Sequence, residues 1–168
     1  MPMREYLFGR ALELSEAIAH REMLRARNKK VVFTNGCFDI LHVGHAEYLA
    51  WARSQGDALF VGLNSDDSVR DLKGAPRPFV PYEERARLLC ALRSVDVVIG
   101  FSERTPESLL ERLRPDVHVK SAQYRVEDLP EARIVLAYGG DVRLAPHREG
   151  SSTTDIVERI RAHFSSER

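Results

Sequence analysis

The chain has 168 residues, 43% of them hydrophobic and 30% charged, a balance typical of one globular domain. Its 25 lysines and arginines are matched by 25 aspartates and glutamates, and the resulting net charge of zero argues against binding to a nucleic-acid backbone. No apolar run approaches the ~18 residues of a membrane span, and residues 1–10 lack the apolar core of a signal peptide. Two cysteines are too few for a disulfide framework, so we expect a cytoplasmic protein without membrane contact.

Helical patterns and short β-branched runs alternate along the chain. Helical spacing covers 5–27, and five apolar runs predict buried strands at 31–33, 58–63, 95–99, 117–119 and 141–145. Further helices are predicted at 44–55, 82–93, 106–113, 130–138 and from about 152, with a polar loop at 64–81. This alternation predicts an α/β fold: a Rossmann-like five-stranded parallel sheet with helices on both faces. We expect a helical extension over 1–29 and one domain over 30–168.

Polar clusters follow the predicted strands. In open parallel sheets ligands bind beyond the carboxyl ends of the strands. The clusters are residues 34–45, 64–67 with Lys73 and Arg77, 100–102, Lys120, and 147–154. Neither G-x-G-x-x-G nor G-x-x-x-x-G-K-[ST] occurs, so a bound phosphate would have to be held in another way.

The segment His42-Val43-Gly44-His45 offers such a way. Its two imidazoles are three residues apart at a predicted helix start, so they share one face of that helix. Gly44 would let a ligand approach the backbone where free N–H groups favour an anion, and an imidazole can carry positive charge there. The alternatives are two ordinary surface histidines, or a metal site with Cys37 that lacks a fourth ligand and the usual zinc spacing.

A second phosphate-binding candidate precedes the last predicted helix. The run Gly150-Ser151-Ser152-Thr153-Thr154-Asp155 contains a capping box formed by Ser152 and Asp155. A cap needs one hydroxyl and four occur in succession, after a glycine, which is a suitable phosphate cradle at a helix amino end. The sequence therefore predicts that both helix starts face one anionic ligand.

These residues resemble a known family. Residues 34–45 are similar to the HxGH motif of the nucleotidyltransferase superfamily in its cytidylyltransferase-like branch. Further segments follow in matching order: Asn64-Ser65-Asp66, Leu72-Lys73-Gly74, Arg77-Pro78, Glu84-Arg85, Val95-Asp96, Thr105-Pro106, Arg114-Pro115-Asp116 and Ser152-Thr153-Thr154. Over about 28–162 the set most closely resembles the D-glycero-β-D-manno-heptose 1-phosphate adenylyltransferases.

The resemblance implies an enzyme that transfers AMP from ATP to a heptose 1-phosphate with Mg²⁺, giving ADP-heptose and pyrophosphate. It implies a homodimer and no resident metal of the protein itself. The implied catalytic residues are His42, His45 and Lys73. Implied nucleotide-binding residues are Thr34, Asn35, Gly36, Phe38, Asp39, Gly44, Ser152, Thr153 and Thr154, and implied substrate-binding residues are Arg77, Arg85, Lys120 and Tyr124.

The chain departs from the family pattern after the fourth predicted strand. Residues 120–124 read Lys-Ser-Ala-Gln-Tyr, where the family usually has lysine, two glycines, aspartate and an aromatic residue. An amide in place of a carboxylate changes which hydroxyls are accepted as donors, so the acceptor stays open. One alternative is a cytidylyltransferase acting on glycerol 3-phosphate or another polyol phosphate. The other is a nucleotide-binding protein without turnover.

Overall fold

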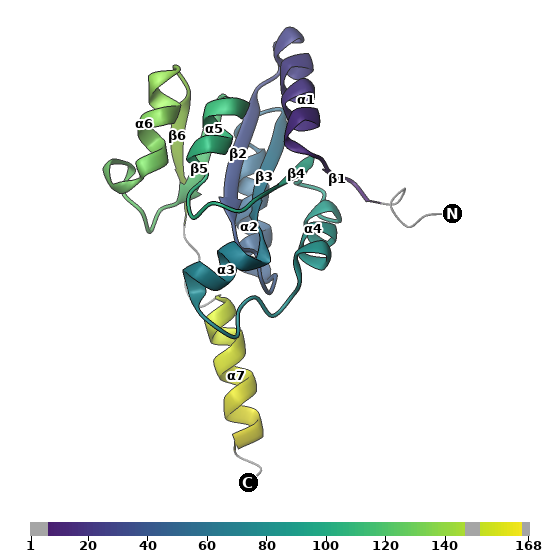
Figure 1. Ribbon diagram of the computed structural model, residues 1–168, viewed down its shortest axis with the longest axis vertical. Helices are drawn as coiled ribbons and strands as arrows, with labels where there is room; N and C mark the ends of the chain where they lie inside the picture. Colours follow the sequence, from purple (N-terminus) through teal and green to yellow (C-terminus); the bar gives the residue numbers. More distant parts are fainter. Residues whose placement is uncertain (1–6, 147–151, 166–168) are drawn as a thin grey trace.

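A six-stranded parallel sheet organises the molecule (Figure 1). The computed structural model describes residues 7–146 and 152–165. The strands are β1 (Arg10–Ala11), β2 (Val31–Gly36), β3 (Ala58–Asn64), β4 (Val97–Phe101), β5 (Val117–Ser121) and β6 (Asp141–Ala145). They lie side by side in the order β1-β4-β3-β2-β5-β6. The predicted Rossmann-like α/β fold is thereby confirmed, with one more strand than expected.

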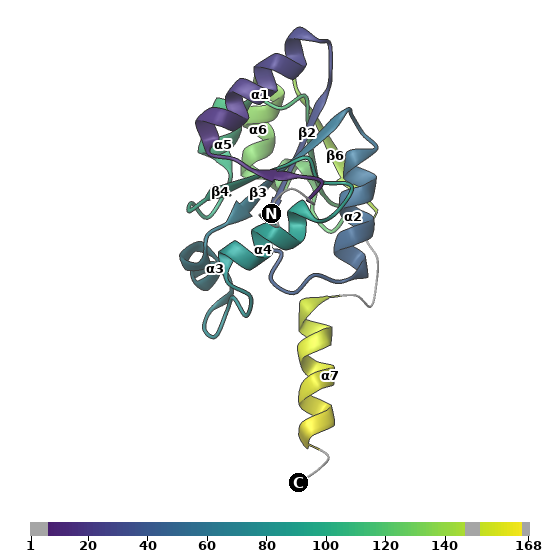
Figure 2. The same cartoon turned by 90° about the vertical axis from the view of Figure 1, so that its right-hand side faces the viewer.

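Helices cover both faces of the sheet (Figure 2). On one face α2 (Val43–Arg53) and α4 (Tyr82–Cys90) bury an apolar cluster that includes Leu49 and Leu89. On the other face α1 (Leu14–Ala26), α5 (Glu107–Leu113) and α6 (Pro130–Ala137) bury a cluster that includes Phe60 and Leu110. Because the inner strands are covered on both sides, they appear in the sequence as continuous apolar runs.

The additional strand lies in the segment predicted to be an unbroken helix over 5–27. Strand β1 pairs with β4, and α1 begins only at Leu14, behind a capping box made by Glu13 and Glu16. Gly9 passes so close to the backbone that an added Cβ would lie 2.6 Å from the Val95 carbonyl oxygen. A two-residue strand has no periodicity of its own, which is why the sequence pattern did not reveal it.

The polar segment predicted as a loop over 64–81 contains a helix, α3 (Asp66–Lys73). The Ser65 hydroxyl caps its start by accepting a hydrogen bond from the Ser68 amide, at 3.2 Å. The helix buries only Ser68 and Val69, so its apolar stripe is too narrow to stand out among charged residues.

The last helix, α7 (Thr153–Ser165), extends away from the sheet and the helices that cover it (Figures 1 and 2). None of its residues is buried. Its amino end lies at the edge of the body where the strands β2 to β5 have their carboxyl ends, and this edge holds the candidate site. None of the described helices has the length and apolar character that crossing a bilayer requires.

Candidate active site

The strand order reverses direction between β2 and β5. From β2 the chain builds outward through β3 and β4 on one side, and it then crosses to β5 and β6 on the other. Beyond the carboxyl ends of β2 and β5 the connections therefore lead in opposite directions, and open parallel sheets usually bind ligands at such a switch point. The loop after β2 carries the two histidines, and Lys120 lies near the end of β5.

The two histidines lie against each other at the start of α2. Their rings stack with centroids 3.8 Å apart and an angle of 27° between the planes. Phe38 packs edge-on against His45 at 5.2 Å, and a Cβ on Gly36 would lie only 3.0 Å from that phenyl ring. Within the described residues, the buried Nδ1 atoms of His42 and His45 have no hydrogen-bond partner. The imidazoles are therefore held by packing and not by hydrogen bonds through Nδ1.

Burial changes the charge of this pair. Desolvation, with a smaller contribution from the neighbouring His42, lowers the pKa of His45 to about 4. Desolvation also lowers the pKa of His42, and the Asp155 carboxylate partly offsets that effect. Both imidazoles are therefore neutral near pH 7 in the free protein. The sequence predicted that the imidazoles carry positive charge beside a phosphate. In the free protein they are instead neutral, and each has one N–H donor. A bound anion would raise the pKa of each ring.

The second predicted segment lies beside the first. At the start of α7 the Thr153 hydroxyl donates to the Ile40 carbonyl oxygen in the loop after β2, at 3.4 Å. The capping box is present: the Ser152 amide donates to the Asp155 carboxylate at 2.9 Å, and the Asp155 amide donates to the Ser152 hydroxyl at 3.0 Å. Gly150 and Ser151 lie outside the described residues. The amino ends of α2 and α7 are thus brought to one place, with Gly44 in the first turn of α2 and Thr154 exposed in that of α7.

A separate polar group lies at the carboxyl ends of β2 and β5. The Lys120 ammonium donates to the Asn35 side-chain oxygen at 3.2 Å and lies 3.3 Å from the Glu131 carboxylate on α6. It also lies 5.4 Å from the centre of the Tyr124 ring, whose side chain is exposed. Three of the predicted ligand-binding residues therefore meet across the ends of β2 and β5.

Asp39, in the loop after β2, forms hydrogen bonds to the proline-rich loop before α4. This buried carboxylate accepts hydrogen bonds from the backbone amides of Phe79 and Val80, at 2.8 and 2.9 Å. It also pairs with the Arg77 guanidinium at 2.9 Å, and that guanidinium lies over the Phe79 ring. Asp39 and Arg77 thus shape the loop itself, so their contacts favour positioning roles over free phosphate contacts.

Two further predicted residues are buried beneath the surface of this edge. Arg85 is fully buried and donates to the Val80 and Cys37 carbonyls and to Asp66. Thr34 is also fully buried, and its hydroxyl is bonded to the Tyr48 hydroxyl at 2.7 Å. The structure therefore gives both residues protein partners where the sequence suggested ligand contacts.

Lys73 is different, because its side chain is exposed at the end of α3. Burial raises the pKa of the Cys37 thiol, and the Lys73 and Arg85 charges partly offset that rise. Lys73 therefore lies close enough to the loop after β2 to act on it electrostatically.

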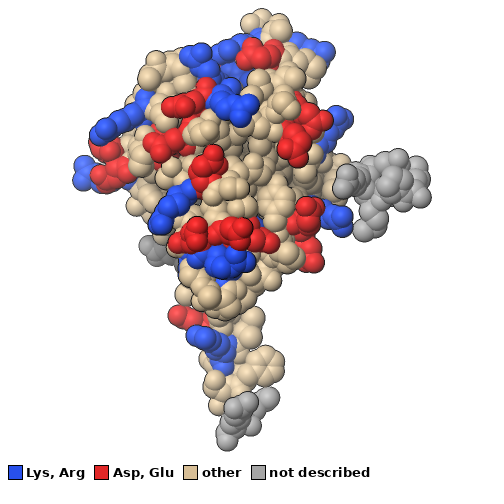
Figure 3. Space-filling model, viewed as in Figure 1, with Lys and Arg blue, Asp and Glu red and all other residues tan. Residues whose placement is uncertain are grey.

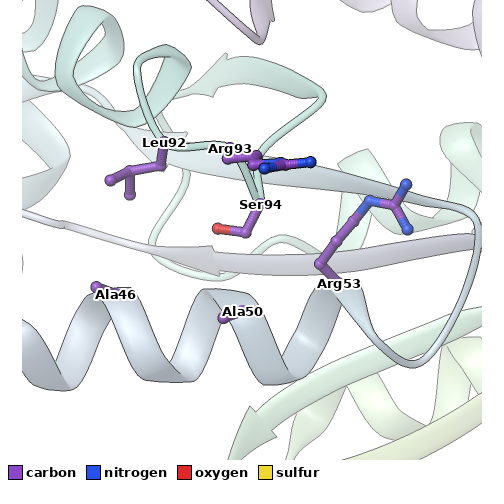
Figure 4. A pocket seen from close by; sticks show the side chains of 6 residues that line it. All are labelled: Ala46, Ala50, Arg53, Leu92, Arg93 and Ser94. Carbon is purple, nitrogen blue, oxygen red and sulfur yellow. The ribbon is translucent and has the colours of Figure 1, made fainter.

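The site is an open edge and not an enclosed cavity. A hollow of about 470 Å³ lies between α2 and the turn after α4, but Ala46, Ala50, Arg53, Leu92, Arg93 and Ser94 line it and neither histidine does (Figure 4). On the face seen in Figure 3, positive and negative side chains are interspersed. Among the described residues, no three His, Cys, Asp or Glu side chains are grouped to hold a metal ion.

The family model described as cytidylyltransferase-like matches residues 33–159, which include both helix starts. The chain belongs to the cytidylyltransferase-like family. Its relatives include proteins named "Bifunctional protein HldE". That of Pseudomonas paraeruginosa (strain DSM 24068 / PA7) is 54% identical over 150 residues, which are 89% of this chain and 32% of the relative. That of Geobacter sulfurreducens is 50% identical over 143 residues, 85% of this chain and 29% of the relative. The chain thus spans about a third of the length of these curated relatives.

Solved structures share the cytidylyltransferase-like architecture. The lipopolysaccharide core biosynthesis protein from Thermoplasma volcanium GSS1 is 25% identical, with a TM-score of 0.59 over 73% of this chain and 99% of that one. The pantoate-beta-alanine ligase from Francisella tularensis is 13% identical, with a TM-score of 0.60 over 91% of this chain and 77% of that one. The similarity to the pantoate-beta-alanine ligase concerns the fold alone.

Sequence reasoning missed two residues of this cytidylyltransferase-like site, Tyr48 and Glu131, and one role of Asp155. Tyr48 joins Thr34 to the Val119 carbonyl, which it reaches at 3.0 Å, and so ties α2 to β2 and β5. Glu131 meets Lys120, and Asp155 acts on His42 as well as capping α7. In the sequence Tyr48 resembles a core aromatic residue of an amphipathic helix, and the carboxylates resemble ordinary first-turn acids. Only the spatial arrangement reveals these roles.

Proposed function

We propose that this chain transfers AMP from ATP to a sugar 1-phosphate, D-glycero-β-D-manno-heptose 1-phosphate, releasing pyrophosphate and forming ADP-heptose. The observation that carries the proposal is the contact between Thr153 and Ile40, because it joins the stacked histidines to the hydroxyl-bearing start of α7. The HldE relatives match over the segment that carries the resemblance to heptose adenylyltransferases and so favour this acceptor over a polyol phosphate.

In the proposed reaction an oxygen of the sugar phosphate attacks the α-phosphorus of ATP. The bond from that phosphorus to its bridging oxygen breaks, and pyrophosphate leaves with the electron pair. The attacking phosphate is already a nucleophile, so positioning and charge stabilisation supply most of the rate. His42 and His45 donate N–H groups to the α- and β-phosphates, and the free amides at the start of α2 add to this field.

The remaining predicted residues take supporting roles in this proposal. Ser152, Thr153 and Thr154 receive phosphates at α7, and Lys73 approaches the phosphates from α3. Asn35, Lys120 and Tyr124 contact the substrate between β2 and β5. Asp39, Arg77, Arg85 and Thr34 hold the surrounding loops, as their protein contacts support.

Mg²⁺ belongs to the proposal as a cofactor that arrives with the triphosphate. Magnesium is commonly held by phosphate oxygens and water with few protein ligands. The sparse carboxylates of this edge fit that manner of binding, since Asp39 already has three protein donors. When bound, the ion would neutralise charge on the triphosphate.

The proposal also includes a cytoplasmic homodimer. Two free cysteines, Cys37 and Cys90, support a reducing compartment. Ile160 and Phe164 on α7 are 52% and 65% exposed, and such apolar side chains are suited to a partner surface. Sedimentation of the full chain would measure the oligomeric state.

A screen of substrates tests the reaction. The protein is incubated with Mg²⁺, ATP or CTP, and heptose 1-phosphate or glycerol 3-phosphate, while pyrophosphate release is followed. We expect release only with ATP and the heptose phosphate. Release only with CTP would overturn the proposal, and ATP binding without release from any acceptor would support the protein without turnover.

Substitution of either histidine tests the site. His42→Ala and His45→Ala should each lower kcat by about 10²–10³-fold, the usual cost of removing one donor to the transition state. His163→Ala, on the exposed part of α7, is the matched control and should keep the parental rate. A histidine variant with parental kcat would remove that residue from the proposed chemistry.

A further inference from the structure

The most unusual charged group outside the histidine site is Glu131. Its side chain is only 4% exposed, in the first turn of α6. Glutamate is almost never this buried unless it is paired, because burying an unpaired carboxylate is costly. Burial would raise the pKa of Glu131, but the contact with His118 and the Lys120 ammonium outweigh this effect and lower the pKa to about 2. Glu131 is therefore a buried anion at neutral pH.

Two side chains face this carboxylate, and only one of them is charged. The Nε2 atom of His118 lies 3.7 Å from the Glu131 carboxylate, on a ring that is fully buried against Phe33. Burial lowers the pKa of His118 in spite of this contact, so the imidazole is neutral near pH 7. Lys120 is therefore the counter-ion of Glu131, at 3.3 Å. A buried ion pair of this kind is weak evidence for stability and stronger evidence for a fixed arrangement.

The pair limits what Lys120 can do. An ammonium group has three N–H donors, and here one reaches Asn35, while the Glu131 carboxylate lies 3.3 Å away as the counter-ion. N–H donors therefore remain for a ligand, on a lysine whose charge is balanced and which lies next to the exposed Tyr124 ring. Such a group suits a neutral hydroxyl beside an apolar sugar face better than it suits a phosphate.

The arrangement differs from the family pattern at the neighbouring loop. The chain has the amide Gln123 where that pattern has a carboxylate, and the buried counter-charge for Lys120 comes from α6. We infer that Glu131 is a positioning residue that fixes Lys120 between β2 and β5, so that an N–H of Lys120 contacts a hydroxyl of the acceptor sugar. This inference rests on the proposed function and adds to it the sugar-recognising side of the site.

A double-mutant cycle in the full chain tests the inference. The variants are Glu131→Gln, Lys120→Met and the double variant, assayed with ATP and heptose 1-phosphate. Glu131→Gln should raise KM for the sugar phosphate about tenfold, the usual scale for one charge-assisted hydrogen bond, and leave KM for ATP within about twofold. The double variant should be no worse than Lys120→Met alone, because Glu131 acts through that lysine. Glu131→Asp should restore part of the loss.

The matched control is Glu127→Gln, three residues before the start of α6, where the carboxylate side chain is 74% exposed and pairs with Arg125. This variant should keep both KM values. The inference is overturned if Glu131→Gln leaves KM for the sugar phosphate unchanged. It is also overturned if KM for ATP rises equally, which would assign Lys120 to the ribose, or if the two single effects multiply.

A stability cycle covers the case in which one variant folds poorly. Lys120→Met leaves a buried carboxylate without its counter-ion and should lower the urea midpoint, and adding Glu131→Gln should restore it. If the double variant keeps the lowered urea midpoint, the proposed pairing of Lys120 with Glu131 is overturned. If the parental protein releases no pyrophosphate, the proposed function itself is overturned. If the parental protein turns over normally but the effects of Glu131→Gln and Lys120→Met are additive, only this inference is overturned.

Discussion

At the scale of single residues, the site depends on polar groups that the fold buries without satisfying. The stacked imidazoles of His42 and His45 have low pKa values because their surroundings disfavour the charged form. Their Nδ1 atoms also have no hydrogen-bond partner among the described residues. In the proposed complex a phosphate would favour the charged form of each imidazole and so raise its pKa.

The pH dependence of stability tests this account. The pKa of His45 falls from 6.5 in the unfolded chain to about 4 in the folded one, so between these values the unfolded state binds more protons. Stability should therefore fall as the pH drops from about 6.5 to 4, by about 3 kcal/mol from this residue. Urea unfolding of His45→Gln should show a flatter profile over that range. Parallel profiles for the variant and the parental protein would contradict the assigned pKa.

At the scale of elements, the site is formed by loops that side-chain hydrogen bonds connect to one another. Asp39 joins the loop after β2 to the loop before α4, and Thr153 joins the same loop to α7. Strands and most helices could be predicted from the sequence because each has a clear period over enough residues. The polar residues at the strand ends could be predicted as one group because parallel strands end at one edge. The buried hydrogen-bond partners of the site residues could not be predicted, because contacts such as that of Arg85 with the Cys37 carbonyl join positions far apart in the sequence and leave no local pattern.

Asp39→Asn tests the fastening of the proline-rich loop. The change leaves the Arg77 guanidinium without its buried counter-ion, and we expect a loss of about 2–4 kcal/mol in unfolding free energy. KM for the substrates should rise as well, because the loop loses its shape. Asp67→Asn is the matched control, since its pair with Arg70 is 90% exposed on the carboxylate side and should contribute little. Equal stability losses in the two variants would contradict the proposed role of Asp39.

At the scale of the whole molecule, the starts of α2 and α7, proposed to bind phosphate, and the Lys120 group lie at one end of the sheet. The opposite end carries no part of the proposed chemistry. Helix α1 and strand β1 complete the sheet and its covering layer, with Arg21 buried and bonded to Asp116 at 3.0 Å. The expected extension over 1–29 thus contributes, from residue 7 onward, to the same body as the remainder of the chain.

Removal of divalent cations should separate stability from activity. If Mg²⁺ arrives with the triphosphate, EDTA should abolish pyrophosphate release and leave the Tm of the nucleotide-free protein unchanged. ATP with Mg²⁺ should raise that Tm through binding, and EDTA should reduce the increase. A lower Tm in EDTA without nucleotide would contradict the proposal, because it would indicate a cation held by the protein alone.

The outward direction of α7 has a consequence for how nucleotide occupancy could be observed. A helix without buried side chains opens easily, so its amides should exchange with deuterium rapidly in the free protein. In the proposed complex the triphosphate bridges the first turns of α2 and α7. Slower deuterium uptake in residues 153–157 would then report a bound nucleotide at a helix that contributes almost nothing to the hydrophobic interior.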